Sequence, residues 1–149
     1  MEMTSGMFSS LSPTWRTPRD SFDKWNAEFS FNLDAAALEN SALCPDWFGP
    51  DHSDPTRRDA FEHEWNGNVW LNPPYGREIK FWLEKANREA TTNPKNNVVV
   101  CLIPARTDTA WFHDYCIHHE VRLLRGRLRF SEAKSCAPFP SALVIMKGN

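Results

Sequence analysis

The sequence predicts an α/β domain whose sheet is mostly parallel and ends in antiparallel C-terminal strands. Two β-rich segments, Val69–Leu71 and Val98–Ile103, flank a stretch with helical periodicity, which is typical of the strand-helix-strand unit of a parallel sheet. The second segment is continuously apolar, as in a strand covered on both faces. Short β-rich segments without an intervening helix follow near the C-terminus, and they favour antiparallel pairing.

The chain of 149 residues has the usual length of one domain. Residues 1–14 carry no hydrophobic period and predict a flexible leader, so the folded domain is expected over 15–149. The longest apolar run, Val98–Ile103, is too short to cross a membrane, and no signal peptide precedes it. We therefore expect a soluble, cytoplasmic protein without a membrane partner.

The first half of the chain predicts one helix and one short strand. Thr17 is expected to cap the helix, with Pro18 at its first position. The buried stripe of this helix has spacings of three and four: Phe22, Trp25 and Phe29. Residues 31–34 then alternate as a short strand does, and the Pro- and Asp-rich stretch over 45–59 predicts a loop with one helical turn.

The second half predicts two helices and the remaining strands. A helix begins near Arg77 and ends at Asn93-Pro94, with Glu84 and Arg88 paired outside its buried stripe. Asp108 is expected to cap a helix that carries Trp111 and its neighbours. The last three strands are predicted at Val121–Leu124, Arg127–Phe130 and Ala142–Met146.

The formal net charge of −2 hides a marked asymmetry along the chain. Residues 20–65 contain eleven acidic and three basic side chains, whereas residues 121–149 contain six basic and one acidic. Both segments could be solvated faces. The alternative is an acidic side near a cationic ligand and a basic side near phosphates.

The four cysteines predict free thiols in a reducing compartment, because their spacings form neither a disulfide framework nor a zinc motif. His113, Cys116, His118 and His119 scatter over different helix faces. We expect no metal site.

Asn72-Pro73-Pro74-Tyr75 follows a predicted strand at its carboxyl end, where open parallel sheets bind ligands. An exocyclic amine on a purine is a poor nucleophile because its lone pair is delocalised into the ring. Two acceptors, the Asn72 side-chain oxygen and the Pro73 carbonyl, could grip its two N–H groups. The prolines stiffen the turn, and Tyr75 offers a flat surface on which a base can stack.

With this loop the sequence resembles the amino-methyltransferases of nucleic acids, and in particular the Dam-like family of small phage and prophage DNA N6-adenine methyltransferases. The resemblance covers about residues 15–147. Matching segments follow one another in order: Thr17-Pro18, 31–36, 69–75, 102–109, 111–113, 125–130 and 137–143.

The resemblance implies a class I, Rossmann-like fold that transfers a methyl group from S-adenosylmethionine to adenine N6 of a flipped-out nucleotide. It places Thr17, Pro18, Asp34, Ala35, Ala36 and Asn72 at the cofactor. The chain lacks the Gly-x-Gly of larger methyltransferases after its first strand. The short separation of Asp34 from the catalytic loop leaves little room for a second and a third strand, which are expected to be short or missing.

The resemblance also implies that DNA is the partner. An adenine in a duplex must be flipped out of the helix, and contacts with the phosphates offset the cost of flipping. The candidate DNA-binding residues are Arg106, Arg122, Arg125, Arg127 and Arg129, with Phe139 as a second wall of the base pocket. Methylation of another amine, in cytosine N4, RNA or a protein glutamine, remains open at this point. A catalytically inactive DNA-binding relative and the oligomeric state remain open as well.

Overall fold

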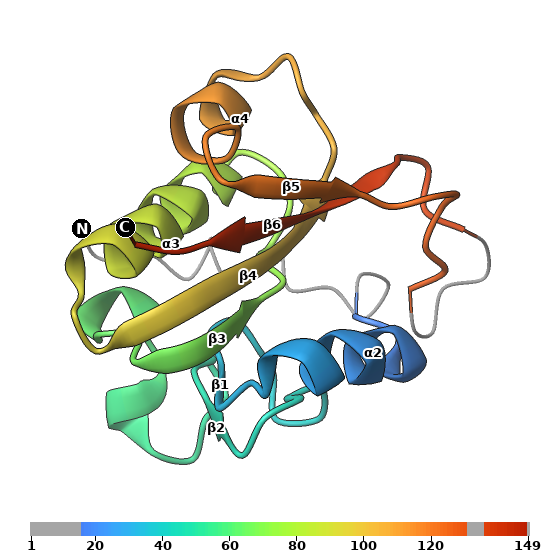
Figure 1. Cartoon of the computed structure of the whole chain (residues 1–149). Coiled ribbons are helices and arrows are strands. Elements are labelled where there is room, and N and C mark those ends of the chain that lie inside the picture. The colour runs from blue at the N-terminus through green and yellow to red at the C-terminus, as the bar shows by residue number, and fades with distance from the viewer. Residues whose placement is uncertain (1–15, 131–135, 149) are drawn as a thin grey trace.

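The structure is a computed structural model that describes residues 16–130 and 136–148. The predicted leader over 1–14 lies outside the described residues. Figure 1 shows a mixed α/β fold around one twisted sheet. Its helices are α2 (Arg19–Phe29), α3 (Ile79–Thr92) and α4 (Ala110–Tyr115), with two 3₁₀ turns at Pro55–Arg57 and Ala60–Glu62; its strands are β1 (Leu33–Asp34), β2 (Asp46–Trp47), β3 (Gly67–Leu71), β4 (Asn96–Pro104), β5 (Glu120–Leu123) and β6 (Ser141–Met146).

The sheet has six strands in the order β2-β1-β3-β4-β6-β5. The pairs among β2, β1, β3 and β4 are parallel, while β6 is antiparallel to both β4 and β5. This confirms a mixed sheet with a parallel centre and an antiparallel C-terminal part. Between β1 and β3 the chain forms only the two-residue β2, which agrees with the expected shortening.

The sheet buries a separate apolar cluster on each face. Alternate residues of β4 face opposite sides, as the two-residue period of a strand requires. Val99, Cys101 and Ile103 pack with α3 and α4, whereas Val98, Val100 and Leu102 pack with Phe22 of α2. The apolar run at 98–103 is thus a strand covered on both faces, as predicted. No helix in the described part of the chain is long and apolar enough to cross a membrane.

The start of α2 differs from the prediction. Pro18, not Thr17, is the N-cap, and no side chain makes a capping hydrogen bond there. The Thr17 hydroxyl instead contacts the side chain of Asn72, in the loop that follows β3. The expected cap is therefore wrong because a tertiary partner 55 residues away holds this hydroxyl.

The cap of α4 also lies one residue from its predicted position. Thr109, not Asp108, occupies the N-cap, and its hydroxyl accepts a hydrogen bond from the N–H of Phe112. Both residue types favour this position, so the backbone path decides between them. The end of α3 agrees with prediction, since Thr92 is its last residue and Asn93 its C-cap.

Residues 124–130 and 136–140 form an arm that extends beyond the sheet beside α2 (Figure 1). Arg127–Phe130 is not a strand of the sheet, so this prediction is wrong. The alternation of arginine and apolar residues has another cause. The N–H of Ala137 bonds the carbonyl of Leu128, in the register that already pairs Glu120 with Ile145. The arm therefore continues the β5–β6 hairpin, with Leu124, Leu128 and Phe130 turned toward the α2 face.

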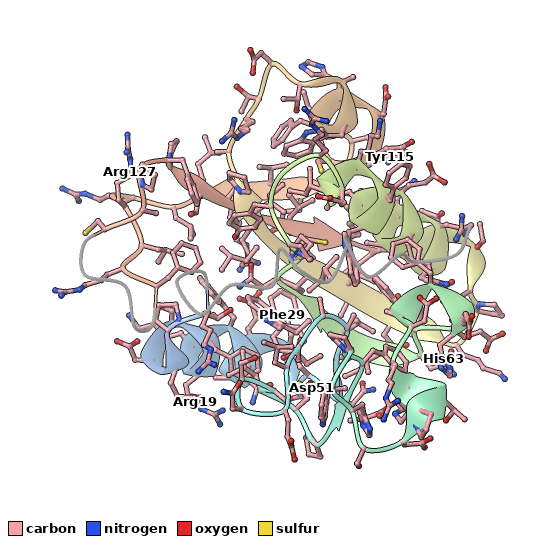
Figure 2. All side chains as sticks on the ribbon, turned by 180° about the vertical axis from the view of Figure 1, so that it is seen from behind. Arg19, Phe29, Asp51, His63, Tyr115 and Arg127 are labelled. Atoms are coloured by element: carbon pink, nitrogen blue, oxygen red, sulfur yellow. The ribbon has the colours of Figure 1, made fainter. Side chains whose placement is uncertain are left out.

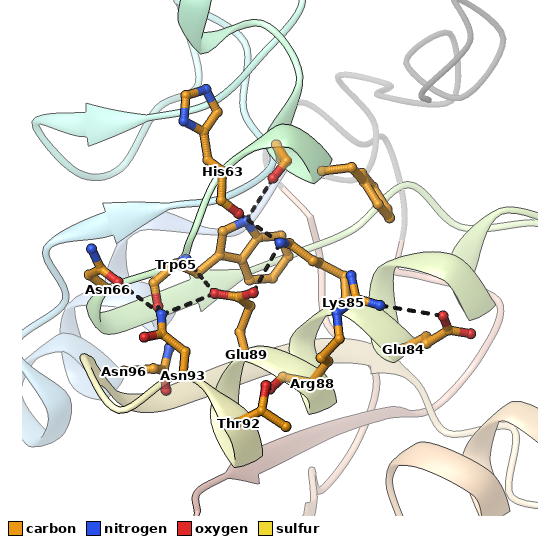
Figure 3. A network of polar contacts seen from close by, with 12 residues as sticks. His63, Trp65, Asn66, Glu84, Lys85, Arg88, Glu89, Thr92, Asn93 and Asn96 are labelled. Atoms are coloured by element: carbon orange, nitrogen blue, oxygen red, sulfur yellow. Dashed lines mark hydrogen bonds and ion pairs between the residues drawn. The ribbon is translucent and has the colours of Figure 1, made fainter. Parts of the chain in front are cut away.

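A buried polar network fixes the segment that leads into β3 (Figure 3). The ammonium of Lys85 lies 3.0 Å from Oε2 of Glu89 and donates to the carbonyl of His63 at 2.7 Å. Glu89 Oε1 accepts from the N–H of Trp65 at 2.6 Å and from the amide of Asn93 at 3.1 Å. These contacts tie α3 to the residues just before β3, the strand that carries the Asn72 loop.

Candidate active site at the strand ends

The strand order reverses between β1 and β3. The chain passes from β1 to its outer neighbour β2, and from β3 to β4 on the opposite side. In an open α/β sheet, such a switch point creates a crevice at the carboxyl ends of the strands, and ligands bind there. Asp34 ends β1, and Asn72 directly follows β3, so these two predicted site residues lie at the carboxyl ends of paired strands at the switch point, where the crevice is expected.

The Asn72-Pro73-Pro74-Tyr75 loop is held from two sides. Both prolines are buried, which fixes the path of the chain after β3. The side-chain amide of Asn72 donates to Thr17 Oγ1 at 3.1 Å. The hydroxyl of Tyr75 lies 3.0 Å from Asn72 Oδ1 and 3.2 Å from the carbonyl oxygen of Leu102 in β4, and these two acceptors share its single proton. The structure thus brings Thr17, Asn72 and Tyr75 together.

Asp34 is a buried carboxyl group at the edge of the crevice. Its oxygens accept hydrogen bonds from the N–H groups of Leu43 at 3.1 Å and Ala36 at 3.4 Å. Burial raises the pKa of Asp34 to about 7, although these two N–H groups act in the opposite direction. Ala35 and Ala36 are buried beside it, so they shape the backbone around the crevice rather than its exposed surface.

A cavity of about 560 Å³ lies beside Tyr75. Three predicted site residues line it: Tyr75, Arg106 and Phe139. The rings of Tyr75 and Phe139 meet edge to face, with centroids 5.6 Å apart. Phe139 belongs to the arm, so the arm supplies one wall of the cavity, as expected for Phe139.

Arg77 and Trp111 also line this cavity, and the sequence reasoning missed both. Arg77 lies in the turn before α3 and is exposed. Trp111 lies in the first turn of α4. Because the cavity is built from three separate stretches of the chain, no spacing within one stretch identifies these residues. The signal that was available for Arg77 is its position two residues after Tyr75.

The predicted DNA-binding arginines fall on two faces of the hairpin. Arg122 faces α2, where its guanidinium donates to both oxygens of Glu28 at 2.7 Å and to Glu120 at 2.6 Å. The hydrogen bonds that Arg122 donates to Glu28 and Glu120 hold its pKa above its usual range. This residue therefore joins α2 to β5, and two carboxylates already neutralise its charge.

The other three arginines of the arm, Arg125, Arg127 and Arg129, are exposed and alternate with the inward-facing apolar residues. Figure 2 shows Arg127 on the arm pointing away from the body of the protein, at the opposite end of the view from His63. Asp51 lies on the β1–β2 side. The charge asymmetry of the sequence thus corresponds to a spatial separation between the arm and the β1–β2 side.

The acidic segment is largely explained by local structure. Asp54 accepts from the N–H of Thr56, and Asp59 accepts from the N–H of Phe61, so both cap 3₁₀ turns. Asp46 pairs with Arg57. Asp34 is different, because it is the buried carboxyl group among the acidic residues of this described segment.

The cysteines in the described residues are free thiols, with Cys44, Cys101 and Cys116 buried and Cys136 exposed. Within the same residues, no group of three or more histidine, cysteine or acidic side chains could hold a metal ion. The histidines near α4 have structural contacts instead. His118 and His119 both contact the side-chain oxygen of Asn87, at 3.3 Å and 2.7 Å.

Comparison with known proteins identifies the family of this chain. The family described as DNA N-6-adenine-methyltransferase (Dam) matches residues 5–147. The chain belongs to the Dam family of DNA N-6-adenine-methyltransferases. It is similar to the DNA N-6-adenine-methyltransferase of Escherichia phage T1, with 33% identity over 101 residues. That alignment covers 66% of this Dam-family chain and 38% of the phage protein.

Proposed function

We propose that this chain transfers a methyl group from S-adenosylmethionine to N6 of adenine in DNA. The observation that carries the proposal is the position of Asn72, which follows β3 at the sheet's switch point and contacts the hydroxyl of Tyr75, a residue that lines the aromatic cavity. We further assign the sheet to the class I, Rossmann-like methyltransferases in a trimmed form. Its parallel centre, its antiparallel C-terminal pair and its two-residue β2 support that assignment.

The chemistry asks the protein to make an aromatic amine nucleophilic. Asn72 Oδ1 and the Pro73 carbonyl would each accept one N–H of adenine N6, which localises the lone pair on nitrogen. When bound, the cofactor would supply an electrophilic methyl group on its sulfonium. Transfer of that methyl group to the N6 lone pair would leave the electron pair of the broken S–C bond on sulfur. N6 afterwards loses one proton to solvent.

The residues present fit a cationic cofactor at the crevice. Asp34 is a buried carboxyl group whose hydrogen-bond donors are two backbone N–H groups. A nearby sulfonium would favour its ionised form, because an opposite charge offsets the cost of burial. Thr17 joins the same region through its hydrogen bond with Asn72, and Pro18 follows it in the chain.

A nucleic acid suits the cavity better than a protein glutamine does. Arg77 and Arg106 line the same cavity as the rings of Tyr75 and Phe139, so cationic and flat aromatic groups lie together. This combination matches a nucleotide, which carries both a base and a phosphate. Membership of the Dam family of DNA N-6-adenine-methyltransferases favours adenine over cytosine.

The proposal is tested by incubating the purified protein with S-adenosylmethionine labelled in its methyl group and with unmethylated duplex DNA. The DNA is then digested and its nucleosides are separated. Labelled N6-methyladenine is the expected product. Label in N4-methylcytosine, in RNA or in added protein would assign another amine. A chain that binds cofactor and DNA but labels none of these is the inactive relative.

Cofactor affinity is expected to rise with pH around Asp34. The pKa of this buried carboxyl group is raised to about 7, and a cation binds its ionised form better. The ionised fraction grows about tenfold between pH 6 and pH 8, so the affinity should grow by up to about the same factor. Isothermal titration calorimetry at both pH values measures this change.

The Asp34→Asn variant is the matched control, because it keeps the size of the side chain but cannot ionise. Its affinity reports the pH dependence that belongs to the cofactor itself. The cofactor affinity of the wild-type protein should rise more between pH 6 and pH 8 than that of the variant. The variant should also bind the cofactor more weakly at pH 8. Equal pH dependence in the two proteins would remove Asp34 from the cofactor site.

DNA affinity is expected to depend on the exposed arginines of the arm. Arg127→Ala removes one candidate phosphate contact and should weaken binding to all DNA sequences alike. The slope of log affinity against log salt should fall by about 1, and by about 2 in the Arg125→Ala/Arg127→Ala double variant. Fluorescence anisotropy over a salt series measures these slopes.

Arg88→Ala provides the comparison, since Arg88 is an exposed arginine on α3 and pairs with Glu84. Its salt slope should stay at the wild-type value. Cofactor affinity should be unchanged in all three proteins. If Arg127→Ala instead weakens cofactor binding and leaves the DNA slope intact, the assignment of the arm to DNA is wrong.

A further inference from the structure

The amide of Asn72 has two chemically different ends. Its oxygen can accept a hydrogen bond from an N–H group of the target amine. Its NH₂ group is itself a donor, so it cannot form a hydrogen bond with those N–H groups. A carboxylate at this position would present two equivalent oxygens. An asparagine can therefore do the proposed chemistry only when its oxygen faces the amine, and some other group must select that orientation.

Two hydroxyl groups hold the two ends of this amide. Asn72 Nδ2 donates to Oγ1 of the buried Thr17 at 3.1 Å, on the side of α2. Asn72 Oδ1 accepts from the hydroxyl of Tyr75 at 3.0 Å, on the side of the cavity that Tyr75 lines. The oxygen of the amide thus faces Tyr75, which lines the cavity, and the nitrogen faces Thr17.

The Tyr75 hydroxyl is suited to act as a donor. Burial raises the pKa of Tyr75 above its usual range, so the phenol keeps its proton at any working pH. The carbonyl of Leu102, 3.2 Å away, holds the hydroxyl in place from β4. A carbonyl-type oxygen has two lone pairs, so Asn72 Oδ1 can accept from Tyr75 and from adenine N6 at the same time.

We propose that the hydroxyl groups of Tyr75 and Thr17 act as positioning groups that turn the oxygen of the Asn72 amide toward the target amine. The inference rests on the proposed function, since it concerns the residue that binds the amine. It assigns to Tyr75 a role separate from base stacking. The ring contacts the base, while the hydroxyl sets the orientation of its neighbour three residues earlier.

A double-mutant cycle between Tyr75 and Asn72 tests this role. Tyr75→Phe keeps the ring and removes the hydroxyl, so kcat should fall about tenfold while the affinities for DNA and cofactor stay unchanged. The same change made together with Asn72→Asp should lower kcat less than about twofold relative to Asn72→Asp alone, because a carboxylate needs no orientation.

Three further variants complete the experiment. Tyr115→Phe is the matched control, because the Tyr115 hydroxyl contacts Glu84 away from the site, and its kcat should equal the wild-type value. Thr17→Val should lower kcat at unchanged protein stability, and Thr17→Ser, which restores the hydroxyl, should recover it. This pair tests the inference even if Asn72→Asp has no activity of its own.

The inference would be overturned if Tyr75→Phe lowered kcat equally with asparagine and with aspartate at position 72. The hydroxyl would then act only through its contact with the carbonyl of Leu102. Full activity of Tyr75→Phe and of Thr17→Val would overturn it as well. Both results are distinct from failure of the proposed function. The proposed function fails if Asn72→Ala still methylates adenine, whereas the inference fails alone if Asn72→Ala is inactive and Tyr75→Phe is fully active.

Discussion

Methyl transfer to adenine is expected to fall by about 10²–10³-fold when Asn72 is replaced with alanine, the scale known for removing one precisely placed polar group from an active site. The change deletes the oxygen that would grip N6, so the amine lone pair stays delocalised. It also deletes the hydrogen bonds to Thr17 and Tyr75. The loss should appear in kcat, since stacking and phosphate contacts still bind the DNA.

Single-turnover transfer of labelled methyl groups measures the chemical step apart from product release. Asn72→Asp is the matched comparison because it keeps an acceptor oxygen in the same place, and it should retain far more activity than Asn72→Ala. Unchanged melting temperature and cofactor affinity establish that the alanine variant is folded. Rapid transfer by a folded Asn72→Ala protein would remove this residue from the chemistry.

Strong local periodicity explains which parts of the fold the sequence could predict. The run at 98–103 and the helix from 79 to 92 have patterns that only one structure satisfies, and both were predicted. β2 was missed because two residues have no period, and their pairing depends on the neighbouring β1. The alternation at 127–130 was real, but it arises in an arm that continues a hairpin rather than in the sheet.

The candidate site was predictable where one short segment carries its chemistry, as in the Asn72–Tyr75 loop. It was not predictable where partners lie far apart in the chain. Thr17 was expected at the cofactor by resemblance, yet its hydrogen bond to Asn72 also depends on how α2 docks against β3. Trp111, at the start of α4, also lines the cavity only because of how distant segments pack together.

The sequence suggested Glu84 and Arg88 as the pair that supports α3, but that pair is half exposed, with 3.7 Å between its charged groups. The same spacing of four also joins Lys85 to Glu89, whose side chains are only 7% and 9% exposed. Periodicity alone cannot rank these pairs, because burial decides their energies. A surface ion pair contributes about 0–1 kcal/mol, whereas loss of one partner from a buried pair leaves an uncompensated charge.

Lys85→Met is therefore expected to lower the free energy of unfolding by about 3–5 kcal/mol. Methionine fills the space of the lysine stem but leaves the carboxylate of Glu89 buried without its cation. The carbonyl of His63 also loses a donor. Urea denaturation followed by tryptophan fluorescence gives the free energy, and Trp65, which lies within the network, contributes to that signal (Figure 3).

Arg88→Met is the matched control, since it removes a cation from the same helix by the same substitution. Its effect should stay below about 0.5 kcal/mol. A second comparison uses Lys85→Met combined with Glu89→Gln. The neutral amide still has an oxygen for the N–H of Trp65, so the double variant should be more stable than Lys85→Met alone. Equal costs for Lys85→Met and Arg88→Met would show that the buried pair does not stabilise the fold.

The contribution of this network to protein stability should fall as the pH is lowered. Burial alone would raise the pKa of Glu89, but the N–H of Trp65, the ammonium of Lys85 and the amide of Asn93 outweigh it and lower the pKa below its ordinary value of 4.5. An acid whose pKa is lower in the folded state stabilises the protein above its unfolded pKa and loses that contribution as the pH falls through its folded pKa. The wild-type stability should thus decline below about pH 4.5, and Glu89→Gln, which cannot titrate, should decline less steeply there. Parallel curves for the two proteins would mean that Glu89 has the same pKa folded and unfolded, and that its hydrogen bonds only compensate its burial.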